Sequence, residues 1–283
     1  MSGATERGAR WTTAGAGERP VVWSYGGGVQ SAAIAVLVLR GELPRPERIV
    51  TADTSREASA TWAYLEDVVG PALAETGLAV EVAPHTLATR DLHSADGKPL
   101  MPVYTRQRPG RSDRGRSGVG QMRNFCSGEW KREVVRRYVR SLGYGPEGRS
   151  ARGPVVNWLG ISRDEVNRLS GDRVQWMTTR WPLIFDRPTT RAGCVRLVEE
   201  HGWPRPPKSS CWCCPFCGDR QWRELRDAWP EDWARAVALE AELRERDAGL
   251  FLHRSGVPLA EASLGNGETD EAGLPCQSGF CFV

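Results

Sequence analysis

Cysteine is the residue type whose spacing in this sequence most clearly indicates chemistry. Four of the eight cysteines lie in the segment CWCCPFC, where Cys211, Cys214 and Cys217 are each separated by two residues. Three thiolates at this spacing on a turn can converge on one iron–sulfur cluster. A tetrahedral zinc site uses the same spacing, so Zn2+ is the alternative metal. We expect a metal site here, because a reducing compartment disfavours structural disulfides.

The cysteines outside this segment carry different expectations. Cys194 shares the apolar side of a predicted helix with Leu197 and Val198, which favours a buried core residue. Cys276 and Cys281 lie at the C-terminal end among Gly, Ser and Pro, where little core can be buried. A thiol on such an end can reach a bound nucleotide, and the alternative is two thiols without a role in a disordered tail.

A run of three glycines follows a short apolar segment, PVVWSY, and precedes a helix-forming stretch, VQSAAIAVLVLRG. This order predicts a strand, a glycine turn and a helix. Backbone N–H groups in such a turn can surround a phosphate, and the helix dipole adds to the attraction. An ordinary tight turn is the alternative. The predicted phosphate-binding residues are Ser24, Gly26, Gly27, Gly28, Gln30 and Ser31.

Alternating strands and helices must position these residues. Apolar runs predict strands at 20–25, 47–53, 78–84 and 154–160, with helices after most of them. This alternation predicts an α/β fold with a doubly wound, mostly parallel sheet, whose ligands collect beyond the carboxyl ends of the strands. The predicted domains are a disordered tail over 1–19, a nucleotide-binding domain over 20–190, and a helical cysteine-rich region with a flexible tail over 191–283.

Charged residues follow two of the predicted strands. Asp53 ends the second strand, where its carboxylate can accept a hydrogen bond from a ribose hydroxyl or an adenine amine. Arg163 and Arg168 follow the fourth strand and can stabilise phosphate charge. For Asp164, Glu165 and Arg168 the alternative is a helix N-terminal carboxylate pair and a surface ion pair. Phosphoanhydride chemistry needs mainly positioning and charge neutralisation, for which Mg2+ is the natural counterion.

Basic residues are concentrated in one part of the chain, although the net charge is only +3. Eleven Lys or Arg lie between Arg106 and Arg140, against Asp113, Glu129 and Glu133. Residues 91–125 lack periodicity, which predicts a long loop, and WKREVVRRYVR after it predicts a basic helix. This window suits a nucleic acid or another polyanion, although the same charge can equally serve only the phosphates of a nucleotide.

Three segments share their order and much of their sequence with a known family. They are GGGVQS (26–31), DTSRE (53–57) and GISRDE followed by Arg168 (160–168). They resemble the pyrophosphate loop, the Asp-Thr-Gly-x-Glu stretch and the Gly-Ile-Arg-x-Asp-Glu segment of the PP-loop ATP pyrophosphatase superfamily, in its phosphoadenosine phosphosulfate reductase-like branch. WPL at 181–183 is a weaker fourth match. In the first segment Gly26 replaces a Ser and Gln30 replaces an Asp of the family pattern, Ser-Gly-Gly-x-Asp-Ser.

The resemblance implies an adenine nucleotide alpha-hydrolase-like fold and binding of ATP or a related adenine nucleotide. It adds Thr54 and Glu57 to the predicted nucleotide-binding residues. Cys126, in the segment RNFCS, resembles the upstream cysteine of iron–sulfur members. We therefore predict Cys126 as the fourth ligand of a 4Fe-4S cluster, with Cys213 as the competing choice.

In sulfonucleotide reductases a C-terminal cysteine takes part in turnover. The resemblance therefore suggests a catalytic role for Cys276 and Cys281, although the Glu-Cys-Gly motif of those enzymes is absent.

These features predict an ATP-dependent sulfurtransferase. ATP is expected to adenylate a substrate oxygen with release of pyrophosphate, after which a sulfur nucleophile displaces AMP. The expected partners are the adenine nucleotide, a sulfur-donor protein or persulfide carrier, and an acceptor that is a nucleic acid or resembles a nucleotide. The alternatives are a thiol-dependent sulfonucleotide reductase and a zinc-stabilised nucleic-acid-binding module.

Composition excludes several other classes of protein. A hydrophobic content of 40%, together with 31 glycines, is typical of globular proteins and not of disordered chains. No apolar stretch approaches the length of a membrane span, and the first nineteen residues lack the apolar core of a signal peptide. We therefore expect a cytoplasmic protein that does not enter a membrane.

Overall fold

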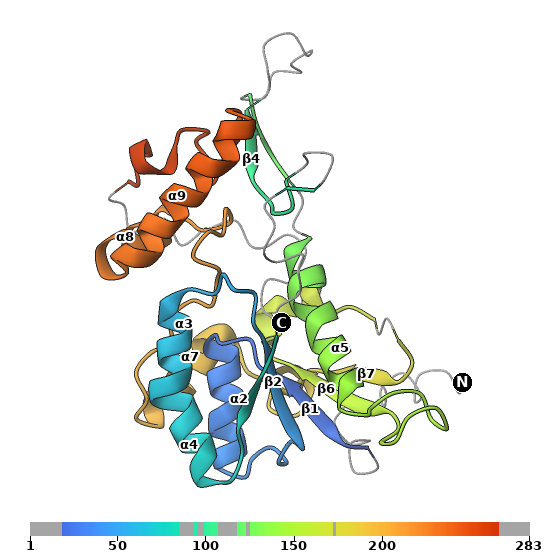
Figure 1. Ribbon diagram of the computed structural model, residues 1–283. Helices are drawn as coiled ribbons and strands as arrows, with labels where there is room; N and C mark the ends of the chain where they lie inside the picture. The colour runs from blue at the N-terminus through green and yellow to red at the C-terminus, as the bar shows by residue number, and fades with distance from the viewer. Residues whose placement is uncertain are drawn as a thin grey trace, which may run out of the picture.

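The computed structural model describes residues 19–84, 93–94, 99–106, 118–122, 125–171 and 174–265. The predicted N-terminal tail, most of the predicted long loop, and both Cys276 and Cys281 lie outside these residues. Two parts can be distinguished in Figure 1. One is a parallel sheet flanked by helices, and the other contains two helices beside a short antiparallel sheet.

The larger sheet has five parallel strands. In spatial order they are β3 (Val80–Ala83), β2 (Arg48–Ala52), β1 (Val21–Ser24), β6 (Val155–Leu159) and β7 (Met177–Arg180). The chain builds the sheet outward from β1 in one direction and then continues on the other side of β1 with β6. Such a reversal opens a crevice at the carboxyl ends of the two central strands, where α/β proteins bind ligands. The predicted α/β fold with a doubly wound parallel sheet is confirmed.

Helices cover both faces of this sheet (Figure 1). On one face lie α2 (Val29–Leu39), α3 (Ser59–Tyr64), α4 (Gly70–Glu75) and α7 (Arg191–Glu200), and on the other lies α5 (Glu133–Ser141). A π-helical segment, Leu65–Val69, joins α3 to α4, and another, Ser127–Arg132, leads into α5. The first π-helical segment ends next to Pro71, which has no N–H and so cannot continue the α-helical hydrogen bonding.

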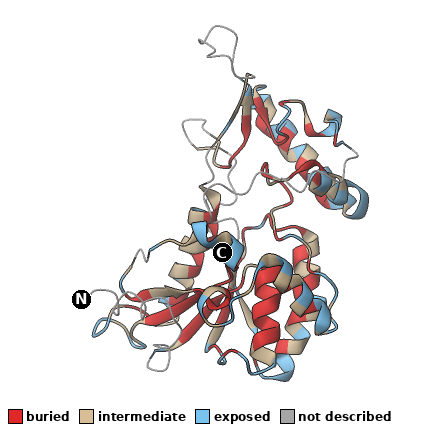
Figure 2. Ribbon diagram, turned by 180° about the vertical axis from the view of Figure 1, so that it is seen from behind, coloured by how far each residue is buried: buried red, intermediate tan, exposed pale blue. Residues whose placement is uncertain are grey.

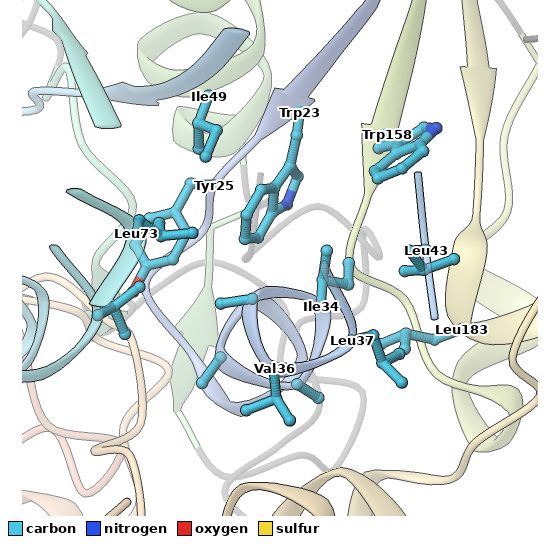
Figure 3. Packing of buried hydrophobic residues seen from close by; sticks show 14 of the residues in the cluster. Trp23, Tyr25, Ile34, Val36, Leu37, Leu43, Ile49, Leu73, Trp158 and Leu183 are labelled. Atoms are coloured by element: carbon cyan, nitrogen blue, oxygen red, sulfur yellow. The ribbon is translucent and has the colours of Figure 1, made fainter. Parts of the chain in front are cut away.

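The two faces of the sheet are packed by alternate strand residues, because successive side chains of a strand point to opposite sides. Trp23 packs with Ile34 of α2 and with Trp158 (Figure 3), whereas Val22 belongs to the cluster under α5. Helix α2 is buried along most of its length, since the sheet covers one side and α7 the other (Figure 2). A helix enclosed in this way must be apolar on all sides, as VQSAAIAVLVL is.

The smaller part has its own core. Its helices are α8 (Asp219–Ala228) and α9 (Pro230–Arg246), and its antiparallel strands are β5 (Val119–Gln121), β4 (Tyr104–Arg106) and β8 (Leu250–Phe251). Trp222, Leu243 and Leu252 are fully buried there together with Cys213. The buried carboxylate of Glu240 accepts hydrogen bonds from the backbone N–H groups of Leu252 and Leu259. Leu259 begins a 3-10 turn, Leu259–Glu261.

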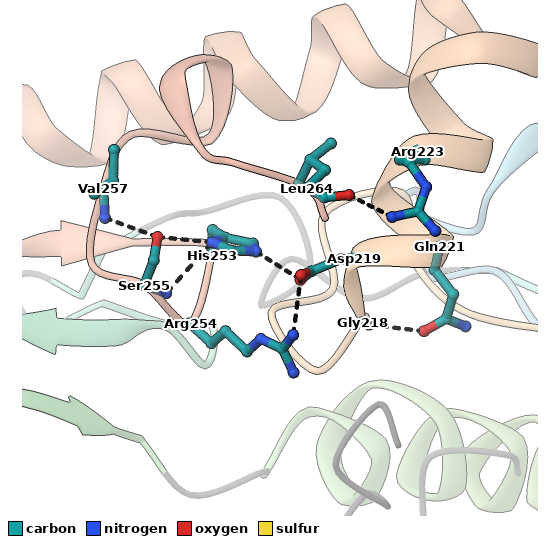
Figure 4. A network of polar contacts seen from close by, with 9 residues as sticks. All are labelled: Gly218, Asp219, Gln221, Arg223, His253, Arg254, Ser255, Val257 and Leu264. Carbon is teal, nitrogen blue, oxygen red and sulfur yellow. Dashed lines mark hydrogen bonds and ion pairs between the residues drawn. The ribbon is translucent and has the colours of Figure 1, made fainter. Parts of the chain in front are cut away.

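A polar network joins α8 to the segment after β8 (Figure 4). Asp219 Oδ1 lies 3.0 Å from His253 Nε2, and Asp219 Oδ2 accepts from Arg254 at 3.0 Å. His253 Nδ1 lies 2.7 Å from Ser255 Oγ. Because Asp219 is the second residue after Cys217, this network fixes the C-terminal side of the cysteine segment.

In the described part of the chain, none of the helices has the length and apolar character that crossing a membrane requires.

Candidate active site

The glycine turn lies between β1 and α2, as predicted. Gly26 N donates to Ser31 Oγ at 2.9 Å, and Ser24 Oγ donates to Asn157 Oδ1 at 2.7 Å, which ties the turn to β6. Gly27 has φ of +73°, and a Cβ at this position would come within 2.5 Å of Thr61 Cγ2 on α3. Glycine is therefore required at position 27 by both backbone conformation and close packing.

The N-terminus of α2 faces this turn with unsatisfied backbone donors. Gly28 is the N-cap, no side chain caps the helix, and no acidic residue stands in its first turn. The first N–H groups of a helix and the positive end of its dipole attract anions. Buried Ser209, from the segment before the cysteines, covers the turn and donates its hydroxyl hydrogen to the carbonyl of Gly26.

Gln30 connects the first sequence motif with the third. Its Nε2 donates to Glu165 Oε2 at 2.8 Å, and its Oε1 accepts from Arg191 Nη1 at 3.3 Å. Glu165 also accepts from Arg168 Nη1 at 2.8 Å, and the Arg168 side chain is only 9% exposed. This pair is therefore part of an interior wall and not of the open surface.

The other charged residues of the third motif lie at the edge of this network. Both carboxylate oxygens of Asp164 accept from the backbone N–H of Arg191, at 2.9 and 3.1 Å, at the start of α7. Arg163 is exposed, and its backbone N–H bonds to the carbonyl of Thr189. The structure thus brings Arg168 to the site with Gln30 and leaves Arg163 at the surface.

The second motif leaves β2 in a strained turn. Asp53 Oδ1 accepts from the Ser55 N–H at 2.6 Å, and Ser55 has φ of +56°. Ser55 stands where the family pattern has Gly, the residue that adopts this conformation without steric cost. Beyond the turn, Thr54 Oγ1 bonds to Glu57 Oε1 at 3.3 Å and lies 3.9 Å from the sulfur of Cys211.

Backbone hydrogen bonds join the second motif to the cysteine segment. Glu57 and Cys211 form an antiparallel bridge, in which Ala58 N donates to Ser210 O at 3.0 Å and Trp212 N donates to Arg56 O at 2.9 Å. The end of β2 and the first cysteine are therefore held in fixed register.

Lys131 is a site residue that sequence reasoning placed only within a basic helix. Its Nζ lies 2.5 Å from Glu57 Oε1, and the side chains are 10% and 7% exposed. Burial by itself lowers the pKa of Lys131, but the Glu57 carboxylate outweighs burial, so the net pKa is raised and the ammonium stays charged. Lysine is rare among the basic residues of this chain. A lysine in such an arginine-rich sequence is the signal that could have pointed to Lys131, because its ammonium is a compact charge that arginine does not replace.

Pairwise interactions link the four cysteines predicted as ligands, but among the described residues no three of their side chains converge closely enough to hold a metal ion. Burial raises the pKa of Cys126 to about 12, with a further contribution from Cys214. Burial also raises the pKa of Cys211 well above its usual value. A hydrogen bond between Cys214 and Cys217 raises the pKa of the former and lowers the pKa of the latter, so this pair shares one proton.

The other two described cysteines differ from these four. Cys194 is fully buried beside α2 and Val198, which confirms it as a core residue. Cys213 is 1% exposed within the core of the smaller part and does not line the cavity described next, whereas Cys126 does. Cys217, which is also a predicted ligand, does not line this cavity either, so cavity lining does not choose between Cys126 and Cys213 as the fourth ligand.

One cavity of about 990 Å³ joins part of this site, whereas Gly26, Gly27 and Glu57 line a separate small cavity of about 20 Å³ that shares Lys131 with it. Cys126, Cys211 and Cys214 line the larger cavity, together with Ser209, Glu165 and Arg168. Within the described residues, no three His, Cys, Asp or Glu side chains converge closely enough to hold a metal ion.

Comparison with known proteins found no matching family model, no matching curated protein and no matching solved structure.

Proposed function

We propose that this chain is a member of the PP-loop ATP pyrophosphatase superfamily that activates an acceptor with ATP and then transfers sulfur to it. The observation that carries the proposal is the bridge between Glu57 and Cys211, which joins the predicted nucleotide-binding strand end to the cysteine segment. Adenylation acts on an acceptor oxygen and sulfur transfer on the atom that carries this oxygen, so the two steps require such proximity.

The nucleotide half of the proposal rests on the glycine turn and its neighbours. The uncapped N-terminus of α2 offers backbone donors to the phosphates, and Arg168 and Arg191 reach the same place from the cavity wall. Magnesium enters as part of the substrate, Mg–ATP. Positioning and neutralisation of the phosphates supply most of what pyrophosphate release requires.

The cysteine half rests on the donor set. Cys126, Cys211 and Cys214 line the cavity and Cys217 belongs to the same segment as the last two. Thiolates are the ligands of iron–sulfur clusters, so this donor set suits a cluster in chemical type, although the side chains would have to move to converge on one. These four residues are proposed to hold it, and when bound it supplies a site where sulfur can be held for transfer. Lys131 and Glu57 lie between the cysteines and the glycine turn, and their ion pair keeps a fixed charge there.

In the proposed reaction, AMP is transferred to an acceptor oxygen and pyrophosphate leaves. A sulfur nucleophile then forms a C–S bond to the acceptor carbon, and the C–O bond breaks so that the activated oxygen leaves with AMP. The chain's own contribution is to bind both reactants and to balance phosphate charge with Arg168 and Arg191.

The nucleotide assignment is tested by calorimetric titration of ATP into Gly28→Ala. Gly28 has an ordinary φ of −101°, and an added Cβ would meet Ser209 Cβ only at 3.4 Å, so the fold tolerates it. The methyl group occupies space beside the phosphate donors, and we expect at least a tenfold loss of ATP affinity. Gly118→Ala, with open space around its Cβ, is the matched control and should bind normally. Unchanged affinity in folded Gly28→Ala refutes the assignment.

The cluster is tested by anaerobic purification followed by iron, sulfide and zinc analysis. We expect iron and sulfide, and loss of both in Cys126→Ala but not in Cys213→Ala. Zinc without iron, together with no ATP turnover, supports a zinc-stabilised nucleic-acid-binding module instead. Release of sulfite from a sulfonucleotide, without pyrophosphate from ATP, supports a sulfonucleotide reductase.

A further inference from the structure

The large cavity has room for more than a nucleotide. Its volume of about 990 Å³ lies at the upper end of the range of roughly 300–1,000 Å³ for small-molecule sites. The inner part, beside the glycine turn and the cysteines, is where the proposed function places ATP and sulfur. The outer part is formed by the segments that precede and follow the cysteines in the sequence.

Positive charges of two kinds line the cavity. The inner ones already have partners: Lys131 pairs with Glu57, Arg168 with Glu165, and Arg191 with Gln30. The outer ones are Arg205, Lys208 and Arg220, all exposed.

The outer arginines are not used inside the chain. Among the described residues, the side chains of Arg205 and Arg220 make no ion pair or hydrogen bond, and Lys208 Nζ bonds only to the neutral Gln221 Oε1 at 2.7 Å. The exposed carboxylates that line the cavity are Asp67, Asp164 and Glu224. Asp164 bonds to the start of α7 in the inner part, so three cations against two carboxylates leave the outer part with a net positive charge. Cations without acidic partners at a cavity mouth attract an anionic ligand.

An aromatic side chain completes the rim. Trp229, at the end of α8, is half-buried and lines the same cavity. Sites for single-stranded nucleic acid combine two features. Cations lie along the sugar–phosphate backbone, and an aromatic ring offers a face on which a base can stack.

The basic window of the sequence does not supply this rim. Among its described basic residues only Lys131 lines the cavity, and Arg136 and Arg137 are paired with Glu133 on the same helix. Arg140 lies over the ring of Trp176.

We propose that Arg205, Lys208, Arg220 and Trp229 form the binding site for a single-stranded nucleic acid acceptor. Phosphodiester groups lie against the three cations, and one base stacks on Trp229. This inference rests on the proposed function for what happens to the acceptor. Because the cysteines lie on an interior wall, the reacting nucleotide has to leave any helical stack to reach them, which favours a single strand over a duplex.

The test measures fluorescence anisotropy of a labelled single-stranded oligonucleotide of about 12 nucleotides, as DNA and as RNA. Titrations are run between about 50 and 200 mM salt, without ATP. Arg205→Glu and Arg220→Glu are compared with Arg226→Glu. Arg226 is exposed on the same helix as Arg220, is paired with Asp227 and does not line the cavity, so it is the matched control.

We expect each rim variant to weaken binding at least tenfold and to reduce the salt slope by about one for each lost phosphate contact. Arg226→Glu should change affinity less than about threefold, which separates a defined contact from general electrostatics. Trp229→Ala should weaken binding roughly 5- to 100-fold with an unchanged salt slope, because stacking is not ionic. Calorimetric ATP affinity of all four variants should equal that of the wild type, which also shows that they are folded.

Three results overturn the proposal: no oligonucleotide binding by the wild type, equal losses in Arg226→Glu and the rim variants, or loss of ATP affinity in the rim variants while oligonucleotide binding is kept. The last result assigns the cations to the nucleotide. Pyrophosphate release is measured separately, so rim-dependent oligonucleotide binding without ATP turnover refutes the proposed function and leaves the rim as a nucleic-acid site.

Discussion

At the scale of single residues, the structure maintains two features that are unfavourable by themselves. Ser55 holds a left-handed backbone conformation at the end of β2, and Lys131 and Glu57 form a buried ion pair. Both lie where the second motif meets the cysteine segment. Strain and buried charge concentrate at functional sites because the rest of the fold can compensate for them.

Ser55→Gly should stabilise the protein. A left-handed conformation costs a non-glycine residue about 1 kcal/mol or more, and the greater freedom of glycine in the unfolded chain offsets part of the gain. We expect the free energy of unfolding in urea to rise by about 0.5–1 kcal/mol. Ser55→Ala, which keeps the Cβ, should show no gain. A gain of the same size in both variants would point to the hydroxyl and not to backbone strain.

Lys131→Met should destabilise the protein strongly, because it leaves the Glu57 carboxylate buried without its cation. Breaking a buried pair in this way costs about 3–5 kcal/mol. Adding Glu57→Gln to the same protein removes the uncompensated charge and should recover part of the loss. Urea unfolding of the wild type, both single variants and the double variant measures the coupling, and additive losses would contradict a direct interaction.

At the scale of elements, side chains from α8 and α9 fix the cysteine segment and the second motif against each other. Asp219 at the start of α8 bonds to the segment after β8 (Figure 4), and Asp232 of α9 bonds to Ser59 at the start of α3. Each contact joins elements far apart in sequence. The cysteine segment before α8 and the second motif before α3 are therefore positioned by these contacts as well as by hydrogen bonds within the two segments.

Asp219→Asn should weaken the protein and change its response to acid. Burial alone raises the pKa of Asp219, but His253 and Arg254 outweigh it, so the pKa is lowered in the folded state. A lowered carboxyl pKa adds stability above the unfolded value of about 3.9, and this stability is lost as pH falls through the folded pKa. We expect a loss of about 2 kcal/mol at pH 7 and a shallower decline below pH 4. Equal acid sensitivity in variant and wild type would contradict this account.

Asp232→Ala should loosen the contact between α9 and α3. Asp232 Oδ2 accepts from the Ser59 backbone N–H at 2.7 Å, and Oδ1 accepts from its hydroxyl at 3.0 Å. Loss of such a cap costs about 1–2 kcal/mol. Thermal unfolding measures it, with Asp227→Ala as the control, because exposed Asp227 pairs only with its neighbour Arg226 in the described structure.

At the scale of the whole molecule, the cavity depends on residues from both parts. Arg168 and Arg191 come from the sheet part, Cys211 and Cys214 from the segment between the parts, and Arg220 from α8. Both described cores are formed by residues up to Leu264.

Truncation after Leu274 should therefore change the melting temperature by less than about 2 °C, since about 1 kcal/mol corresponds to roughly 2–4 °C for a chain of this size. The truncated protein lacks Cys276 and Cys281, for which we predict a role in turnover. We expect normal iron content and reduced activity. Full activity would remove the catalytic role, and a fall of several degrees would show that the tail packs on the folded protein.

Local sequence patterns determined a large share of the fold. The apolar runs that became β1 and β6 were readable because a strand buried on both faces needs a continuous apolar segment. The runs that became β2 and the edge strand β3 were also readable, although these strands are only partly buried. The glycine turn was readable because three consecutive glycines between a strand and a helix leave few other conformations. Cysteine spacing identified the thiol-rich segment, since neighbouring ligands lie close together in any conformation of a short turn.

Only the tertiary structure decided which distant residues meet. The short strands β4, β5 and β8 pair across most of the chain, and no local period marks a strand of two or three residues. Lys131 finds Glu57, and Cys126 lines the cavity while Cys213 enters a core, because helices and strands are oriented by packing. The positive rim likewise exists only where α8 folds back beside the cysteine segment. Such contacts depend on how buried faces match across the whole molecule, which a sequence pattern read in short windows does not contain.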